Sequence, residues 1–362
     1  MRVKLGDIFE IGSGGTPSKS CPEYYGGDIP WVKTGDLKSE YIYGVEDFIT
    51  EDGLGNSSAK MYEEDTVLIA MYGATIGATS ILKISACTNQ ACAAFKRSDK
   101  VIPEYLYYFL KSQKEKFVKD GVGGAQPNIS AGYLKKVEME LLSIREQRTI
   151  VDILNIIENI ANKRKQEIIA LDNLIKARFV EMFGDPIINS RHLETKDLKD
   201  VMILKAGDFT VASDIADEQT ETNPYPCYGG NGIRGYVSEY NQEGDYSLVG
   251  RQGALSGNVQ YASGKFKNTE HALLVTPIVE MNSIWLHQLL LNLDLKRYQT
   301  GAAQPGLSVK NLQEIQVILA PIDEQNRFAE FVKRIDKSKV AVQKALDETQ
   351  LLFNSLMQKY FG

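Results

Sequence analysis

Residues 145–183 read REQRTIVDILNIIENIANKRKQEIIALDNLIKARFVEMF and contain neither proline nor glycine. Isoleucine and leucine recur at spacings of three and four, which predicts an amphipathic helix with a single apolar stripe. The stripe consists of Ile150, Ile153, Ile157, Ile160, Leu171 and Leu174. A helix of about 39 residues would be roughly 58 Å long, which exceeds an ordinary domain helix. A stripe of this length must be covered by a partner.

The end of the chain repeats this segment. When Gln126 is set on Gln304, the register holds without a gap to the C-terminus, where Phe183-Gly184 falls on Phe361-Gly362. The second stripe consists of Phe328, Phe331, Ile335, Val342, Ala345, Leu352 and Leu356. Asp323 is expected to cap the start of the second helix, and a glycine is expected to end each one. We expect the two helices to cover each other; the alternative is that each helix lies on its own domain.

The repeat extends upstream with small gaps. Residues 63–77, EEDTVLIAMYGATIG, resemble residues 242–257, QEGDYSLVGRQGALSG, and residues 3–14 resemble residues 196–207. Short apolar runs that end at glycine turns predict strands, while EYLYYFL and SIWLHQLL predict helices. The chain is therefore expected to hold two copies of one unit, each an α+β domain followed by a long helix.

Composition and motifs argue against an enzyme. The 362 residues are 43% hydrophobic and 24% charged, as in a soluble protein of several domains. No apolar run reaches membrane length and the N-terminus lacks a signal-peptide pattern, so we expect a cytoplasmic protein without a membrane partner. The four cysteines and three histidines show no metal spacing, and the chain contains no nucleotide loop, serine elbow, nuclease or methyltransferase motif. We expect no catalytic residue, no metal and no cofactor in this chain.

Three phrases carry a resemblance to a known family. They are GDIPWVKTGDL at residues 27–37, the AQP-x-[IL]-S turns at 125–130 and 303–308, and the Glu-Gln pair that opens each long helix. In this order, with the turn and the pair duplicated and coupled to two long helices, they resemble the specificity subunit of type I restriction–modification systems. The second domain departs from the pattern, because it lacks the Trp-Val-Lys-Thr phrase and carries YPCYGGNGIRGY instead.

The resemblance implies an α+β fold with two pseudo-twofold-related target recognition domains, residues 1–143 and 185–322. Two long helices, residues 144–184 and 323–362, would separate them and form an antiparallel coiled coil. Each domain would read one half of a bipartite site in double-stranded DNA. The helices would dock two modification (methyltransferase) subunits, which bind S-adenosylmethionine, and a restriction (helicase–nuclease) subunit could join.

A reader of two different half-sites should vary its base contacts and repeat its phosphate contacts, since only base edges carry sequence information. Differing polar positions near shared glycines are therefore the base-readout candidates: Lys33, Thr34, Tyr72, Asn89, Gln90, Asn231, Arg234, Arg251, Gln252 and His271. Arginine can bond guanine and glutamine can bond adenine in the major groove. For each of these positions the alternative is an ordinary solvated loop residue.

Recurring polar and glycine positions are the phosphate candidates: Lys119, Gly123, Gln126, Arg297, Gly301 and Gln304. A basic side chain beside a glycine turn and an amide can hold a phosphate. The alternative is that the two glutamines only anchor their turns. The formal net charge of −6 requires any basic residues that face DNA to cluster locally.

One rival function stays open at this point. Two tandem domains on a coiled-coil stalk would also suit a protein-interaction scaffold with no role in DNA binding.

Overall fold

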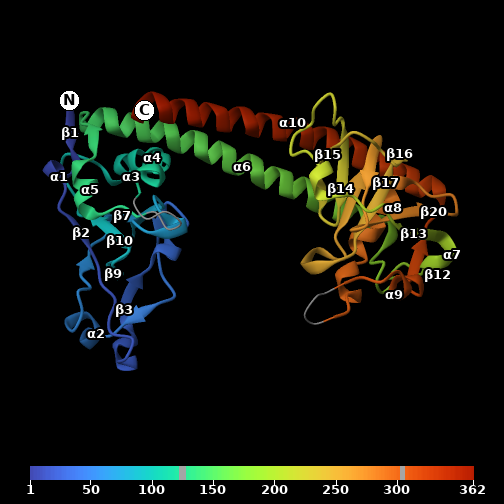
Figure 1. Ribbon diagram of the computed structural model, residues 1–362, viewed down its shortest axis with the longest axis horizontal. Helices are drawn as coiled ribbons and strands as arrows, with labels where there is room; N and C mark the ends of the chain where they lie inside the picture. The colour runs from blue at the N-terminus through green and yellow to red at the C-terminus, as the bar shows by residue number, and fades with distance from the viewer. Residues whose placement is uncertain (122–127, 302–305) are drawn as a thin grey trace. The chain divides into compact units, whose positions relative to one another are not determined.

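The computed structural model describes residues 1–121, 128–301 and 306–362. The chain divides into two compact units, and each is described by itself. Unit 1 consists of Met1–Arg164 and Ala345–Gly362, and unit 2 consists of Lys165–Lys344. Each unit therefore takes part of both long helices, whereas the sequence treats domains and helices as successive segments (Figure 1).

Unit 1 is built from three sheets and short helices. Its strands are β1 (Arg2–Lys4), β2 (Ile11–Ser13), β3 (Tyr25–Val32), β4 (Tyr41–Ile42), β5 (Phe48–Ile49), β6 (Met61–Tyr62), β7 (Val67–Ala70), β8 (Thr79–Leu82), β9 (Ala86–Thr88), β10 (Cys92–Phe95) and β11 (Glu138–Glu140). The sheet orders are β2-β10-β7-β8-β4, β5-β3-β9-β6 and β1-β11. Its shorter helices are α1 (Leu5–Ile8), α2 (Glu51–Gly55), α3 (Pro103–Ser112), α4 (Lys114–Asp120) and α5 (Ala131–Lys136).

Unit 2 repeats this plan. Its strands are β12 (Glu194–Asp197), β13 (Met202–Ala206), β14 (Tyr225–Gly229), β15 (Gly232–Val237), β16 (Gln242–Glu243), β17 (Tyr246–Gly250), β18 (Val259–Ala262), β19 (Lys265–Asn268), β20 (Ala272–Pro277) and β21 (Gln316–Leu319). The sheet orders are β13-β20-β17-β18, β15-β14-β19-β16 and β12-β21. Its shorter helices are α7 (Leu198–Val201), α8 (Ser283–Asn292) and α9 (Val309–Gln313). The α+β fold class and the internal repeat are confirmed.

The shared core of each unit is a small antiparallel sheet covered by one helix. In unit 1, β10, β7 and β8 pair antiparallel, and α3 packs on β7 and β8. In unit 2, β20, β17 and β18 pair in the same order, and α8 packs on β17 and β18. β7 is VLIA with all four residues buried, which is the composition of a strand covered on both faces.

The serine of each AQP-x-[IL]-S turn caps a short helix. The Ser130 hydroxyl accepts a hydrogen bond from the Tyr133 amide at 3.1 Å at the start of α5, and the Ser308 hydroxyl accepts from the Asn311 amide at 3.1 Å at the start of α9. Side-chain oxygens of serine are favoured at this position because they satisfy a free N–H group of the first turn. The recurrence of this serine therefore has a structural cause.

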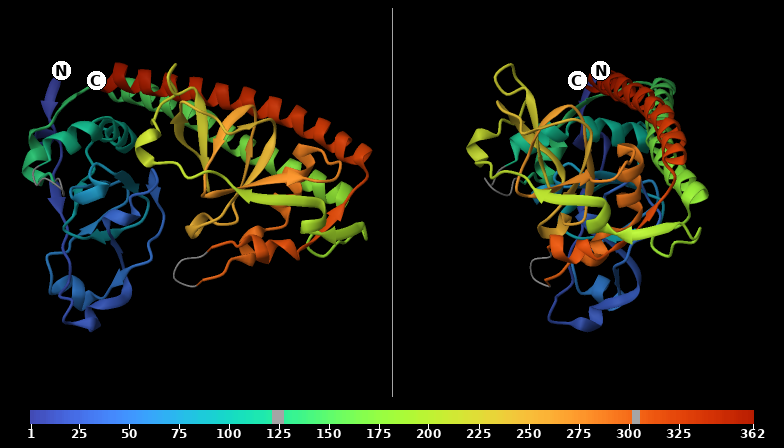
Figure 2. Two further views of the ribbon diagram at one scale, coloured as in Figure 1. Left: turned by 45° about the vertical axis from the view of Figure 1, so that its right-hand side comes forward. Right: turned by 90° about the vertical axis from the view of Figure 1, so that its right-hand side faces the viewer.

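The long helices are α6 (Ile144–Phe183) and α10 (Ile322–Phe361). Because α10 begins at Ile322, Asp323 lies within its first turn, and the prediction that Asp323 caps the helix is wrong. In unit 2 the helices run antiparallel, since Asp172 of α6 forms an ion pair with Lys339 at 2.5 Å while the later Phe179 packs on the earlier Phe328. Figure 2 shows the two helices side by side.

Both expectations for the apolar stripes hold in part. In unit 1, α6 and α10 contribute Ile150, Leu154 and Phe353 to one core that also includes the globular part, so each helix lies on the other and on the domain. Ile160, Leu174 and Leu352, by contrast, are 39%, 46% and 50% exposed, so the predicted stripes are only partly buried.

Both chain ends lie in unit 1. The Met1 carbonyl accepts a hydrogen bond from the Leu141 amide at 2.9 Å, and the Tyr105 hydroxyl donates to the Glu140 carbonyl at 3.4 Å. The Tyr105 ring also packs on Phe361 with a centroid distance of 5.2 Å. The two termini therefore lie near each other in unit 1, as Figures 1 and 2 show.

Candidate nucleic-acid interface

Three loops of unit 2 contact one another where their strands end. They follow β14, β17 and β19 and carry Gly230, Arg251 and His271. The Arg251 amide donates to the His271 carbonyl at 3.0 Å. A Cβ on Gly230 would stand 3.2 Å from the same carbonyl and 3.4 Å from the Cα of Gly250, so glycine allows this close approach. Arg251, Asn231 and His271 are thereby gathered at one place.

The same three junctions meet in unit 1. The backbone N–H of Asn89 donates to the Val32 carbonyl at 2.9 Å, and the backbone N–H of Met71 donates to the Ala91 carbonyl at 2.8 Å. The loops after β3, β7 and β9 are thus joined by backbone hydrogen bonds. Thr16 also donates its hydroxyl proton to the amide oxygen of Gln90, which adds the loop after β2 to the cluster.

The chain that follows each AQP turn completes the cluster. In unit 1 the Ile129 amide donates to the Met71 carbonyl at 3.0 Å, and in unit 2 the Leu307 amide donates to the Arg251 carbonyl at 2.9 Å. Tyr72 and Gln252 occupy equivalent bridges, to Asn128 and Gly306 respectively. Each AQP turn is therefore connected by backbone bonds to the loop with the base-readout candidates. Gly123, Gln126 and Gln304 themselves lie outside the described residues.

The structure gives Lys33 and Thr34 a counterpart that the sequence did not reveal. β3 pairs parallel with β9, Val32 beside Thr88, and β14 pairs parallel with β19, Tyr228 beside Asn268. The two residues after Val32 are Lys33 and Thr34, and the two after Tyr228 are Gly229 and Gly230. The Trp-Val-Lys-Thr phrase and the glycine-rich phrase of unit 2 therefore occupy the same topological place.

The base-readout candidates differ in how far they are already engaged. Arg251 and Gln252 are exposed, and Tyr72 is 43% exposed. Lys33 forms an ion pair with Asp47 at 2.6 Å and lies 5.0 Å from the Trp31 ring centre. An exposed side chain can contact a ligand without first breaking a bond within the protein. This favours Arg251, Gln252 and Tyr72 as base-readout residues.

Four further candidates make local contacts. Asn89 accepts from the Ala91 amide at 3.1 Å, and Asn231 accepts from the Asn258 side chain at 2.8 Å. The His271 Nε2 lies 3.1 Å from a Glu270 carboxylate oxygen. Arg234 is exposed, and its Cδ fills the space where a Cβ on Gly229 would stand, at 2.5 Å. Asn89, Asn231 and His271 belong to these loops and use part of their hydrogen-bonding capacity within them, whereas Arg234 lies on strand β15.

The phosphate candidates that the structure describes are exposed. Lys119 lies on α4, and Arg297 lies on a 3₁₀ turn, Leu295–Tyr298, with its guanidinium 5.5 Å from the Tyr298 ring centre. Gly301 has φ 93°, in the region that favours glycine.

Sequence reasoning missed a second basic pair, Lys114 and Lys296. A Cβ on Gly77 would stand 2.9 Å from the Lys114 Cγ, and a Cβ on Gly257 would stand 2.7 Å from the backbone nitrogen of Lys296. Both glycines end the short turn that follows the base-readout position, and both lysines are exposed. The recurrence of Gly77 and Gly257 was a sequence signal for this pair. The two lysines were missed because the alignment of the two copies has gaps between each glycine and its lysine.

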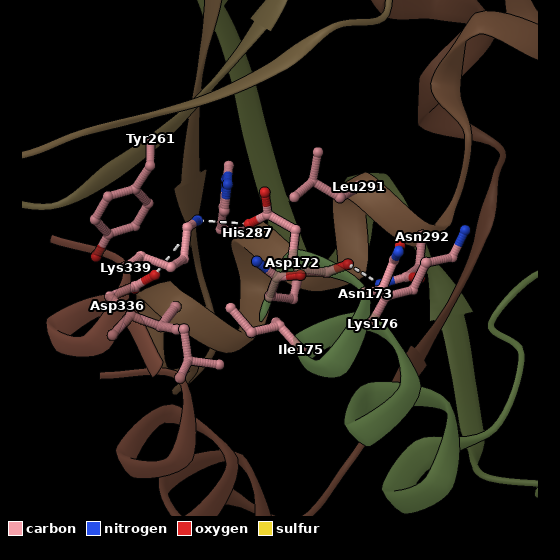
Figure 3. Close-up of a pocket in the computed structure, with 13 residues that line it drawn as sticks. Asp172, Asn173, Ile175, Lys176, Tyr261, His287, Leu291, Asn292, Asp336 and Lys339 are labelled. Carbon is pink, nitrogen blue, oxygen red and sulfur yellow. Dashed lines mark hydrogen bonds and ion pairs between the residues drawn. The ribbon is translucent and has the colours of Figure 1, made fainter. Parts of the chain in front are cut away.

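A cavity in unit 2 lies apart from these loops. It has a volume of about 520 Å³ and lies between α6, α8 and α10 (Figure 3). Burial lowers the pKa of the His287 imidazole in its wall to about 4. In unit 1 the equivalent place between α3 and α6 holds a cavity of about 480 Å³, which Lys111 and Glu158 line as an ion pair at 2.9 Å.

Two other kinds of site are absent from the described residues. No group of three or more histidine, cysteine, aspartate or glutamate side chains there could hold a metal ion. No helix in the same residues is both long and apolar enough to cross a membrane.

Comparisons with known proteins agree with the fold. A family described as the type I restriction modification DNA specificity domain matches residues 1–170 and 191–349. The EcoprrI specificity subunit of Escherichia coli is 30% identical over 350 residues, which cover 92% of this chain and 87% of that protein. The MjaIX specificity subunit of Methanocaldococcus jannaschii is 35% identical over 230 residues, 61% of this chain and 52% of that protein. The crystal structure of a type I restriction–modification S subunit from M. genitalium aligns over 100% of this chain and 96% of its own, with a TM-score of 0.60 and 18% identity.

Proposed function

The chain belongs to the family of type I restriction modification DNA specificity domains, and we propose that it selects the DNA sequence on which a type I restriction–modification complex acts. Each unit would read one half of a bipartite site in double-stranded DNA. The observation that carries this proposal is the duplicated loop cluster, in which equivalent backbone bonds hold different side chains: Tyr72 in unit 1 and Gln252 in unit 2. A backbone frame that repeats in both units and carries different side chains suits two readers of different sequences.

Arg251 is the strongest base-readout candidate. It is exposed, it stands where β17 ends, and its backbone is bonded to both His271 and Leu307. A guanidinium can donate two hydrogen bonds to guanine in the major groove, and it carries its charge at any physiological pH. The equivalent residue in unit 1, Met71, is buried, so Tyr72 takes the reading role there.

The basic residues that recur in both units would hold the DNA backbone. Lys114 and Lys296 lie against equivalent glycines, and Lys119 and Arg297 are exposed nearby in the sequence. Contacts of this type fix the register of a protein on DNA without reading bases. They also make binding depend on salt, because each neutralised phosphate releases counterions.

The long helices would dock the other subunits. Leu174 and Leu352 occupy equivalent places in the repeat, and they are 46% and 50% exposed. An apolar residue exposed at both places suits two copies of the same partner, which in this proposal is the modification subunit that binds S-adenosylmethionine. The catalytic chemistry would belong to that subunit and to the restriction subunit, and this chain would contribute no catalytic residue.

The test compares base and phosphate candidates in the assembled complex. The target is first identified by methylome sequencing of cells with and without this chain. Arg251→Ala should then weaken binding by about 1–3 kcal/mol, because it removes the contact to one base of one half-site. Mutating that base should therefore weaken DNA binding by the variant little further. Lys114→Ala should weaken binding to all sequences and reduce the salt slope by about one charge. Equal weakening of every DNA by Arg251→Ala would show that Arg251 does not read a base.

A further inference from the structure

A buried glutamine in the first turn of α6 joins the long helix to the globular part of unit 1. Gln147 has 0% of its side chain exposed. Its amide oxygen accepts from the Ile102 backbone N–H at 3.0 Å, and its amide nitrogen donates to the carbonyls of Lys100 at 2.8 Å and Leu142 at 2.9 Å. Ile102 is the residue directly before α3. One side chain thus ties the start of α6 to the start of α3.

Gln325 makes the same connection in unit 2. It is 2% exposed, its amide oxygen accepts from the Asn282 backbone N–H at 2.9 Å, and its amide nitrogen donates to the Ala320 carbonyl at 2.8 Å. Asn282 is the residue directly before α8. The glutamine recurs together with the glutamate before it, and its bond to the residue that precedes the packed helix recurs as well.

The helices that follow the glutamine-bonded residues, α3 and α8, pack on the strands that end at the loops with the base-readout candidates. α3 packs on β7, which ends just before Tyr72, and α8 packs on β17, which ends just before Arg251. Apolar packing between helix and sheet is not directional, so by itself it leaves small rotations open. A hydrogen bond weakens steeply when its angle changes, so the glutamine fixes the direction in which α3 or α8 leaves its long helix.

We propose that Gln147 and Gln325 are positioning residues that set the tilt of each reading sheet on its long helix and thereby the spacer length that the protein accepts between half-sites. This inference rests on the proposed function. The glutamines do not contact DNA in this scheme, because they are buried. Their effect reaches the DNA only through the orientation of the loops.

The test uses Gln147→Met and Gln325→Met, which keep the length of the side chain and remove its hydrogen bonds. A second pair, Gln147→Glu and Gln325→Glu, keeps an acceptor for Ile102 or Asn282 and removes the donor. Gln166→Met is the matched control, since Gln166 is exposed on the same helix α6. Assembled complexes are measured on DNAs that keep both half-sites and vary the spacer in steps of one base pair.

We expect the wild-type complex and Gln166→Met to prefer one spacer by about tenfold or more over its neighbours. Gln147→Met and Gln325→Met should reduce this preference to about threefold or less, or move it by one base pair, with the half-site sequences unchanged. The glutamate variants should disturb the profile at least as strongly, because a carboxylate oxygen would replace the donor that faces the backbone carbonyls.

Two outcomes count against different claims. A uniform loss of affinity at all spacers, with the spacer profile preserved or with the variants unfolded, would show that the glutamines only stabilise the fold and would overturn the inference. A wild-type complex that shows no preference among DNA sequences would instead remove the proposed function itself.

Discussion

Acidification should destabilise unit 2 through His287. The imidazole lies in the wall of the cavity in Figure 3, with its Nδ1 3.4 Å from the Ser247 hydroxyl and its ring 5.2 Å from that of Tyr261. Burial lowers its pKa from 6.5 to about 4. Between these two pH values the unfolded chain binds a proton that the folded chain does not, so the free energy of unfolding falls as the pH falls.

The size of the effect follows from the pKa difference. A difference between 6.5 and about 4 corresponds to at most about 3 kcal/mol, lost progressively as the pH drops through this range. Asp336 in the same cavity has a pKa raised by burial, and it acts in the opposite direction because its folded form binds the proton more readily. Replacing the histidine alone separates the two effects.

Tryptophan fluorescence provides the assay. Trp285 is fully buried in unit 2 and Trp31 lies in unit 1, so a Trp31→Phe background reports on unit 2 alone. In urea unfolding, the free energy of unfolding of this protein should fall by about 2 kcal/mol more between pH 7 and pH 4.5 than that of the same protein with His287→Gln. His192→Gln, at an exposed position, is the control. Equal losses with and without His287 would refute the reasoning.

Three further changes have defined outcomes. Leu174→Asp or Leu352→Asp should each leave the isolated chain folded and remove one modification subunit from the complex, which native mass spectrometry can count; retention of both subunits would contradict the docking surface. Inserting about four residues after Arg164 and after Lys344 lengthens the helices by about 6 Å, so the preferred spacer should grow by one or two base pairs in the methylome, and an unchanged spacer would reject the helices as a ruler. A circular permutant with joined ends, opened near Asn189, should fold and keep its half-sites, because Met1 and Phe361 are both held beside α3; a permutant that fails to fold would contradict this.

The repeat could be predicted from the sequence because glycines and apolar residues recur in it at the same spacing. Backbone geometry and core packing require these residues at these positions in both units. The glycines at 77 and 257 recur since lysine backbone or side-chain atoms lie against each one. The serines at 130 and 308 recur since each caps a helix. Local signals of this kind predicted two α+β units and two long helices.

Pairings between distant segments could not be predicted. The parallel pairing of β3 with β9 and of β14 with β19 makes Lys33 the topological equivalent of Gly229, and no sequence similarity marks this correspondence. The Glu-Gln pair was recognised as a repeat, but its buried amide bonds to Ile102 and Asn282 depend on tertiary contacts. The base-readout and phosphate candidates stay predictions, because contact with DNA depends on a surface that only the complex defines.

The discontinuous makeup of unit 1 has a consequence for protein synthesis. The ribosome makes Met1–Arg164 first, but the core of unit 1 also needs Phe353, Met357 and Phe361 from the last turns of the chain. Unit 2 is continuous in sequence and can close earlier, so the part translated first is completed last. A chain that stops at Lys344 should therefore yield a protease-resistant unit 2 beside a digested unit 1, and a nascent chain exposes the open core of unit 1 to chaperones until residues 345–362 emerge.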